Sequence, residues 1–281
     1  MRICSSIAEV RAACVAARAR GKTLGLVPTM GALHEGHLSL VRAAKAKCDA
    51  AVVSIFVNPT QFGPREDLAK YPRPFERDCS MLQNEGIDIL FTPSAVEMYP
   101  QGSVTWVTVE GLSDKLDGRS RPGHFRGVTT VVAKLFNIVE PQVAFFGQKD
   151  AAQLAIIRRL VRDLHFPIEI VAGPIVREAE GLAMSSRNAY LNKNERTRAL
   201  VLQKTLQRAE AQFRAGERNA GKIISGARVT FPSDPHVRLD YLEIVDPDTL
   251  EAIETISSQA LIAIAAFIGT TRLIDNLLLQ A

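Results

Sequence analysis

Two histidines lie three residues apart in the stretch VPTMGALHEGH, which runs from Val27 to His37. An apolar run precedes them and apolar residues at helical spacing follow, so His34 and His37 are predicted to lie at a strand-to-helix turn. Such a pair could bind a metal, fill the core or hold an anion. A zinc site would need a third ligand and usually the longer HExxH spacing, and this stretch supplies neither.

The surrounding residue types favour the anion. Pro28, Gly31 and Gly36 allow the backbone to turn tightly and to approach a ligand. A helix is predicted from about His37, and its first N–H groups carry the positive end of the helix dipole. We therefore predict a phosphate site at this turn.

A second group of polar residues follows the next apolar run, in FVNPTQFG. Asn58 and Gln61 carry neutral amides that can hydrogen-bond a hydroxyl or a carboxylate. A turn signalled by Asn-Pro and Phe-Gly would explain Asn58 and Gly63 without a function, but it leaves Gln61 unexplained. The residues alone leave both interpretations open.

A third group follows the run QVAFF. Lys149 could bind a phosphate as a point charge, and Asp150 could cap the next helix or hold a ribose hydroxyl. Gln153, one helical turn later, would face the same cleft. Upstream, a Gly/Pro-rich loop carries a basic cluster that could be a mobile lid or a solvated surface loop: Arg119, Arg121, His124 and Arg126.

A fourth group lies in AMSSRN, where Ser185, Ser186 and Arg187 offer hydroxyl, backbone and guanidinium donors. Such a set suits a triphosphate that must be held while charge develops on it. No G-x-S-x-G sequence surrounds either serine, so we do not predict a serine nucleophile.

The elements that must position these groups alternate in the first part of the chain. Strands are predicted at 23–29, 50–59, 87–93, 142–147 and 167–174, with helices between them. Near-continuous apolar strands indicate burial on both faces. We predict an α/β fold with a Rossmann-like doubly wound parallel sheet over residues 1–175, followed by a smaller C-terminal α+β domain over residues 176–281. In this second domain a long helix is predicted at 193–216, with strands at 237–245 and 260–269. Ligands of doubly wound sheets bind at the carboxyl ends of the strands, where all four groups fall.

Composition limits the other function classes. The formal charge is +4, from 34 basic and 30 acidic residues, without a long basic run. We expect anionic small substrates and neither a nucleic acid nor a membrane as partner. The four cysteines fit neither a zinc site nor a dense disulfide framework, which favours a reduced, cytoplasmic protein. The first residues are typical of an ordinary helix capped by Ser6, although their arginines could also suggest a transit peptide.

The H-x-G-H element and the later Ser-Ser-Arg loop resemble the HIGH/KMSKS nucleotidyltransferase superfamily. Six blocks together, PTMGALHEGHLSLV, SIFVNPTQFGPREDLAKYPR, RPGHFRGVTTVVAKLFNIVEP, FGQKDAAQL, MSSRNAYL and TTRLIDN, resemble the pantothenate synthetase (pantoate–β-alanine ligase) family. They run from Pro28 to Asn276 and so cover nearly the whole chain.

The resemblance implies a cytoplasmic homodimer that joins pantoate and β-alanine through pantoyl adenylate, using ATP with Mg²⁺ and releasing AMP and pyrophosphate. This step belongs to pantothenate and coenzyme A biosynthesis. It implies substrate contacts at Gln61 and Gln153, with Asn58 as a further candidate from the residues alone. It implies that His34 and His37 bind the phosphates, with His37 a proton donor, and that the C-terminal domain closes over the ATP. The implied ATP-binding residues are Met30, Gly31, Ala32, Leu33, His34, Glu35, Gly36, His37, Gly147, Gln148, Lys149, Asp150, Val176, Met184, Ser185, Ser186 and Arg187.

The predicted catalytic set is His37, His34, Lys149, Ser185, Ser186 and Arg187, whose donors can stabilise charge on the departing pyrophosphate. Ala151 and Ala152 depart from the family pattern. The magnesium ligands stay open, with Asp78 a candidate. Two alternatives are a nucleotidylyltransferase that joins AMP to a phosphate ester, and a non-catalytic or RNA-binding relative, which would predict a concentrated basic or aromatic surface.

Overall fold

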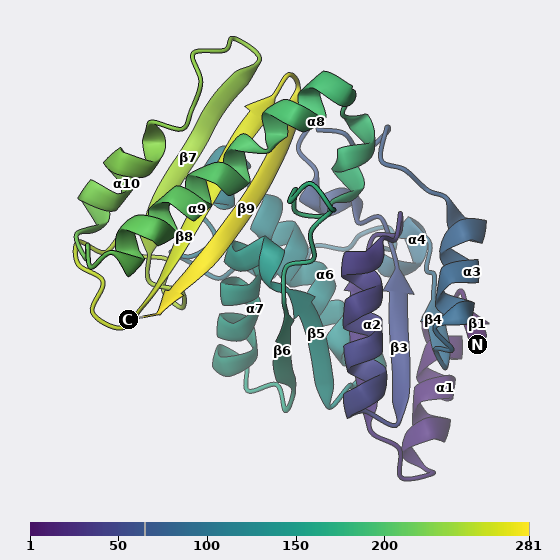
Figure 1. Cartoon of the computed structure of the whole chain (residues 1–281). Coiled ribbons are helices and arrows are strands. Elements are labelled where there is room, and N and C mark those ends of the chain that lie inside the picture. Colours follow the sequence, from purple (N-terminus) through teal and green to yellow (C-terminus); the bar gives the residue numbers. More distant parts are fainter. Residues whose placement is uncertain (65, 281) are drawn as a thin grey trace.

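A six-stranded sheet forms the larger part of the computed structural model, which describes residues 1–64 and 66–280. In chain order the strands are β1 (Arg2–Cys4), β2 (Leu24–Thr29), β3 (Ala50–Ile55), β4 (Ile89–Phe91), β5 (Val143–Gly147) and β6 (Glu169–Gly173). They are parallel and lie in the order β1-β4-β3-β2-β5-β6 (Figure 1). The predicted doubly wound sheet is confirmed, with β1 as an additional edge strand.

Helices cover both faces of this sheet. The elements are α1 (Ile7–Arg18), α2 (Glu35–Lys47), η1 (Pro59–Gln61), α3 (Phe75–Asn84), α4 (Ala95–Met98), α5 (Asp117–Ser120), α6 (His124–Val139), η2 (Gln148–Asp150) and α7 (Ala151–Asp163). Apolar residues of α1, α6 and α7 pack in one cluster, and those of α2 and α3 pack in another. Successive strand residues divide between the two clusters, Leu26 joining the first and Val27 the second, because side chains alternate along a strand.

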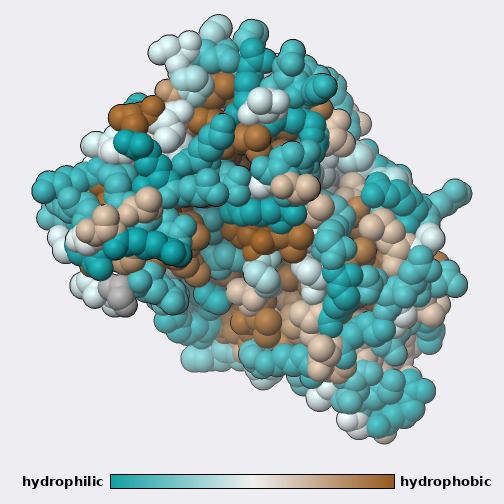
Figure 2. All heavy atoms as spheres, in the orientation of Figure 1, coloured by the Kyte–Doolittle hydropathy of each residue, from teal (hydrophilic) through white to brown (hydrophobic). Residues whose placement is uncertain are grey.

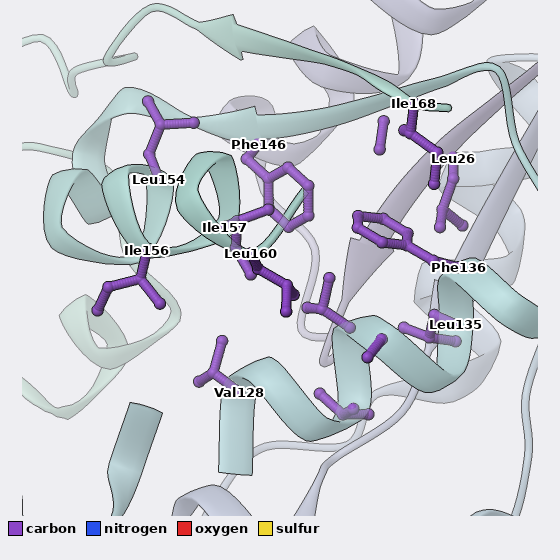
Figure 3. Packing of buried hydrophobic residues seen from close by; sticks show 14 of the residues in the cluster. Leu26, Val128, Leu135, Phe136, Phe146, Leu154, Ile156, Ile157, Leu160 and Ile168 are labelled. Carbon is purple, nitrogen blue, oxygen red and sulfur yellow. The ribbon is translucent and has the colours of Figure 1, made fainter. Parts of the chain in front are cut away.

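The core beneath α6 and α7 is dense. Figure 3 shows Phe136 of α6 and Phe146 of β5 facing each other, and their rings meet edge to face with centroids 6.5 Å apart. Around them lie Leu26, Val128, Leu135, Leu154, Ile156, Ile157, Leu160 and Ile168. At the other end of the domain, Ser6 caps α1 in a capping box with Glu9, as predicted. The first residues are thus an ordinary helix of the core.

The second part is a three-stranded antiparallel sheet with helices on one face. Its elements are η3 (Ser186–Tyr190), α8 (Lys193–Ala199), α9 (Val201–Arg214), α10 (Ala220–Arg228), β7 (Val237–Val245), β8 (Gln259–Ile268) and β9 (Thr271–Gln280). One sheet face packs with the helices, and the other joins the core of the larger part (Figure 1). The smaller α+β unit is confirmed. The exact boundary between residues 175 and 176 stays a prediction.

Three local predictions were wrong. The segment with Arg119 and Arg126 is not one long loop, because α5 covers residues 117–120 and α6 begins at His124. The predicted long helix of the second part is divided at Leu200 into α8 and α9. The helix after β2 begins at Glu35, two residues before the predicted start, because His34 caps it. Within residues 1–64 and 66–280, none of the helices combines the length and apolar composition needed to cross a bilayer.

Gly127 lets α6 approach η1 closely. A Cβ at this position would lie 2.4 Å from the carbonyl oxygen of Thr60 and 2.6 Å from the amide nitrogen of Gln61. We expect Gly127→Ala to lower the free energy of unfolding by about 1–3 kcal/mol, because a packed backbone must shift. Urea unfolding would measure this, with Gly221→Ala on the exposed surface of α10 as a control expected to be neutral or slightly stabilising. Equal stability of the Gly127→Ala protein and the native protein would contradict the prediction.

Candidate active site

A cleft opens where the central strands of the larger sheet separate. β2 and β5 pair at only two positions, Gly25 with Val143 and Leu26 with Ala144, whereas β2 pairs with β3 along its whole length. The strand order reverses here, which is where open α/β sheets bind ligands. The cleft has about 1380 Å³ of empty space, part of it open solvent. Figure 2 shows hydrophobic residues in the hollow between the two parts of the molecule, within a mostly hydrophilic surface.

Most of the predicted site residues line this cleft. They come from the segments that follow β2, β3, β5 and β6, so the fold unites groups that are far apart in the sequence. The predicted residues that line it are Met30, His34, Gly36, His37, Asn58, Gln61, Gly147, Lys149, Asp150, Gln153, Val176, Met184, Ser185, Ser186 and Arg187.

Five residues of the predicted ATP-binding set are not among the lining residues. Glu35 forms an ion pair with Arg42 on the surface of α2, and Gln148 hydrogen-bonds Asn276 of β9. The other three are Gly31, Ala32 and Leu33.

Asp78 explains the position of these three residues. One carboxylate oxygen accepts the Ala32 N–H at 2.7 Å and the other accepts the Leu33 N–H at 2.9 Å. Asp78 is 1% exposed, so its charge depends on these donors. Gly31 has a φ of +78°, and a Cβ there would meet Asp78 at 3.0 Å. Asp78 therefore shapes the loop and is not free to act as the magnesium ligand that the sequence left open.

His34 and His37 face each other, with ring centroids 4.1 Å apart. The Nδ1 of His34 accepts the Gly36 N–H at 3.2 Å, so in the neutral ring the proton lies on Nε2. One N–H at the start of α2 is thus occupied by the protein itself. Gly36 is helical, and a Cβ there would lie 3.0 Å from the His34 ring. The Nδ1 of His37 is buried and has no hydrogen-bond partner within the described residues.

Both histidines are neutral in the free protein. Burial, together with the positive charge of Lys149, lowers the pKa of His34 to about 4. Burial, with His34 and Lys149 as further causes, lowers the pKa of His37 to about 3. An anion in the cleft would oppose this effect, because negative charge favours the protonated ring. The pair is therefore able to respond to a bound phosphate.

Asn58 and Gln61 form one hydrogen-bonded unit. The Nδ2 of Asn58 donates to Gln61 Oε1 at 3.1 Å and to the Gly127 carbonyl at 3.1 Å. Its Oδ1 accepts from the hydroxyls of Thr60 and Tyr99, each at 2.9 Å. Among the described residues, Gln61 Nε2 has only the weak acceptor Met30 Sδ, at 3.2 Å. Gln61 is therefore the amide with a donor to offer a ligand.

Two members of the basic cluster reach the cleft. His124 donates through Nδ1 to the Gln61 carbonyl at 2.8 Å, and Arg121 lies 2.9 Å from its Nε2. Arg121 also pairs with Glu66 through two nitrogens, at 2.7 and 2.8 Å. Burial, with the charge of Arg121, lowers the pKa of His124 to about 3. The remaining two members lie elsewhere: Arg119 pairs with Glu243, and the Arg126 guanidinium covers the Trp106 ring.

The cations of the other loops also have carboxylate partners. Arg187 binds Asp67 through two parallel hydrogen bonds of 2.9 and 3.0 Å. Lys149 Nζ lies 3.7 Å from Asp150. Asp150 occupies the N-cap position of α7 but makes no side-chain hydrogen bond there, which argues against capping by its carboxylate, one of the two roles that the sequence left open. Ser185 caps η3, and Ser186 donates to the Ala32 carbonyl at 3.1 Å. An incoming anion would compete with these carboxylates for the cations.

The sequence reasoning did not identify Asp67 or Tyr71 as members of the site, although both lie within the NPTQFG…YPR block. Asp67 pairs with Arg187, and Tyr71 lines the cleft and is 6% exposed. Their distance from the Ser-Ser-Arg loop in sequence hides the contact. The only available signal was their inclusion in the block that resembled the family.

Comparisons with known proteins give matches along nearly the whole chain. A family model described as "Pantoate-beta-alanine ligase" matches residues 2–278. A pantothenate synthetase of Koribacter versatilis is 58% identical over 281 residues, covering 100% of the chain and 97% of the relative. A crystal structure of pantothenate synthetase from Thermus thermophilus superposes with a TM-score of 0.93 at 46% identity, covering 99% of both chains. Pantoate-beta-alanine ligase from Francisella tularensis, complexed with beta-gamma ATP and β-alanine, gives 0.81 at 33% identity, covering 99% of this chain and 97% of that one.

The depressed histidine pKa values predict a pH-dependent stability. In the unfolded chain histidine titrates near 6.5, whereas the pKa values of His34, His37 and His124 in the folded protein are about 4, 3 and 3. The unfolded state therefore takes up protons first as the pH falls. We expect the free energy of unfolding to be highest above about pH 6.5 and to fall toward pH 3. Each histidine should lower it by up to about 1.4 kcal/mol per pH unit.

Urea unfolding between pH 7 and pH 5 would measure the slope of the free energy of unfolding against pH. His124→Asn, which can still donate to Gln61, should reduce the slope by the contribution of one histidine. An unchanged slope in this variant would show that His124 titrates normally in the folded protein.

Proposed function

The chain belongs to the pantoate-beta-alanine ligase family and is an ATP-dependent ligase of pantoate and β-alanine, and we propose that its reaction passes through pantoyl adenylate in the cleft described above. The observation that carries this proposal is the convergence of four polar loops at the separation of β2 and β5. The family membership argues against both alternatives, the nucleotidylyltransferase and the RNA-binding protein.

The proposed chemistry has two steps. A carboxylate oxygen of pantoate attacks the α-phosphorus of ATP, the bond to the bridging oxygen breaks, and pyrophosphate leaves. The neutral amine of β-alanine then attacks the acyl carbon, AMP leaves with the electron pair of the acyl–oxygen bond, and the nitrogen releases one proton to water. The first step converts the pantoate carboxylate, a poor acylating agent, into a reactive adenylate. Negative charge builds up on the departing pyrophosphate as this happens. A site selective for the transition state must therefore stabilise that charge.

We assign this stabilisation to the catalytic set of the cleft. Lys149 and Arg187 supply positive charge, and Ser185 and Ser186 supply neutral donors. Each well-placed donor could contribute up to about 3–4 kcal/mol in the transition state, as oxyanion-hole donors do. The Asp67 and Asp150 partners would be exchanged for phosphate oxygens when ATP binds.

His34 and His37 contribute differently in this proposal. His34 is fixed by Gly36 and can donate from Nε2 to a phosphate. The buried Nδ1 of His37 has no partner in the described part of the chain, and the triphosphate would raise the pKa of His37 from the low value of the free protein. We propose that His37 contacts the transition state as a donor of a hydrogen bond or proton, and that His34 mainly binds nucleotide.

Pantoate is assigned to the amide-lined side of the cleft. Gln61 offers its Nε2 donor, and Gln153 of α7 lines the same space. All polar atoms of the Asn58 side chain already have protein partners, so we propose that Asn58 orients Gln61. This changes the predicted role of Asn58 from substrate contact to support. The second step needs mainly the placement of the amine, which can be worth roughly 7–11 kcal/mol.

Magnesium is proposed to enter with ATP. Among the described residues no group of three or more His, Cys, Asp or Glu side chains could hold a metal, and Asp150 is the one carboxylate among the described lining residues. This set fits Mg²⁺, which is commonly held by substrate phosphates, waters and one or two carboxylates. When bound, the ion would neutralise phosphate charge, and Asp150 is the protein group placed to hold it.

The remaining expectations are also proposals. The four free cysteines suit a reducing compartment, which supports a cytoplasmic location. A homodimer is implied by the family resemblance, and the exposed side chains of Val104 and Trp106, 82% and 40% accessible, are candidate contacts. We also retain the domain boundary between residues 175 and 176 and the closure of the second domain over ATP.

An exchange assay tests the adenylate. With ATP, magnesium, pantoate and labelled pyrophosphate, but without β-alanine, we expect label to enter ATP, because the first step is reversible on its own. Omission of pantoate should abolish the exchange, and Lys149→Ala should slow it by about 10²-fold. Exchange that requires β-alanine would contradict a separate adenylation step.

Gln61→Ala tests the pantoate subsite. Because the Gln61 amide faces the acid and not the nucleotide in this proposal, we expect KM for pantoate to rise by about tenfold or more while KM for ATP changes by less than about threefold. Initial-rate kinetics with each substrate varied would measure both constants. Thr108→Ala, at an exposed position away from the lining residues, is the control. Equal changes in both KM values would refute the assignment.

A further inference from the structure

Two polar residues are buried side by side in the last strand. Asp275 is 3% exposed and Asn276 is 2% exposed, and they lie on opposite faces of β9 because they are consecutive. Leu273 and Leu279, on the face of Asp275, belong to the core of the smaller part. Ile274 and Leu278, on the face of Asn276, pack against the core of the larger part. Buried polar groups in a strand need partners, and both residues find them in loops of the cleft.

Asn276 is bound to the turn that follows β5. Its Nδ2 donates to the carbonyl oxygens of Gln148 and Lys149, each at 2.9 Å, and its Oδ1 accepts from Gln148 Nε2 at 3.1 Å. These contacts bridge 127 and 128 positions of the sequence. The side chain of Lys149 lines the cleft while its carbonyl is fixed to β9. Asn276 thus restrains the backbone that carries this cation.

Asp275 is bound to the other cation-bearing loop. Its carboxylate accepts two hydrogen bonds from Arg177, at 2.7 and 3.0 Å, and the Asn276 N–H at 2.8 Å. Arg177 also donates to the Gly181 carbonyl and pairs with Ala183 in a short hairpin. This hairpin leads directly to the Ser-Ser-Arg loop.

We propose that Asp275 and Asn276 are positioning residues for the adenylation step, which set the Lys149 turn and the Ser-Ser-Arg loop in register with each other. The proposal rests on the function assigned to Lys149 and Arg187 above. Neither Asp275 nor Asn276 is among the residues that line the cleft, so they act through the loops and not on the substrate. Asp275 and Asn276 are adjacent on one strand, and a strand moves as one body. Their contacts therefore fix the two loops relative to each other.

This arrangement gives a structural explanation for the sequence motif TTRLIDN. Its Arg272 pairs with Asp117 at 2.7 Å and with Asp240 at 2.8 Å, which fixes β9 to α5 and β7. The strand is therefore anchored at the start of the motif and contacts the cleft loops at its end. A merely structural Asp–Asn pair would not need to contact the turn that holds a cation of the site.

A double-mutant cycle between Asn276→Ala and Lys149→Ala tests the proposal, with pantoate-dependent exchange of pyrophosphate into ATP as the readout. We expect Asn276→Ala alone to lower kcat/KM for ATP by about 10- to 100-fold, because small misplacements at a reacting centre are costly. In the Lys149→Ala background the same change should cost less than about threefold, since the group that Asn276 positions is gone.

The second half-reaction separates positioning from general damage. Pantoyl adenylate supplied ready-made should react with β-alanine in the Asn276→Ala protein within about threefold of the normal rate, because no triphosphate contact is needed. Thr205→Ala is the matched control. Thr205 is fully buried in the smaller part, and its hydroxyl binds the Val201 carbonyl at 2.7 Å. Loss of this hydroxyl should lower the free energy of unfolding and leave the rate of pyrophosphate exchange into ATP unchanged.

Asn276→Ser, which keeps one hydroxyl donor, replaces Asn276→Ala in the cycle if the alanine variant does not fold. Equal losses from the Asn276 substitution in both backgrounds, or equal losses in both half-reactions, would overturn the positioning role. A Lys149→Ala protein with normal exchange would instead contradict the function assigned to Lys149, and would be recognised from that single variant.

Discussion

The early separation of β2 and β5 is the constraint on which the site depends. Only two residue pairs join these strands, and the apolar segments beyond them do not close over each other. The sheet is held together there by helices, with α6 and α7 on one face and α2 on the other. If β2 and β5 paired along their full length, their carboxyl ends would meet and the cleft would disappear. The loops after β2, β3, β5 and β6 would then have no common space.

The cleft loops are held by buried polar contacts. Asp78 holds the backbone of the loop after β2, Asn58 and His124 hold Gln61, and Asn276 holds the turn of Lys149. Each such contact is buried or partly buried, and an unpaired partner would carry a desolvation cost of about 1–3 kcal/mol. The loops are therefore fixed before a ligand arrives, which reduces the ordering that binding must supply.

Charge in the cleft is balanced in the free protein. Arg187 pairs with Asp67, Arg121 with Glu66 and Lys149 with Asp150, while the histidines are neutral. Unpaired buried cations would cost far more than these pairs do. A triphosphate carries more negative charge than a carboxylate and can replace it as the partner of Arg187. We propose that this competition with the protein's own acids favours a highly charged nucleotide over a singly charged ligand.

Local sequence signals were sufficient for the type of fold and for most of the predicted residues that line the cleft. Apolar runs, glycine turns and the Ser6 cap located the strands and the first helix. The spaced blocks correctly placed His37, Gln61 and Arg187 in the cleft, each on a different loop. The strands and the cap could be predicted because each depends on neighbours a few residues away, whereas the cleft residues were identified from blocks spread over nearly the whole chain.

The partners of those residues became known only from the packing. Asp78 could have been a metal ligand until the N–H groups of Ala32 and Leu33 were seen to occupy it. The low pKa values of the histidines come from burial, which the local sequence does not encode. The link from Asn276 to Lys149 crosses 127 residues. Contacts of this kind depend on how distant elements pack. The sequence therefore identified the candidate residues, and only the tertiary structure showed which groups they contact.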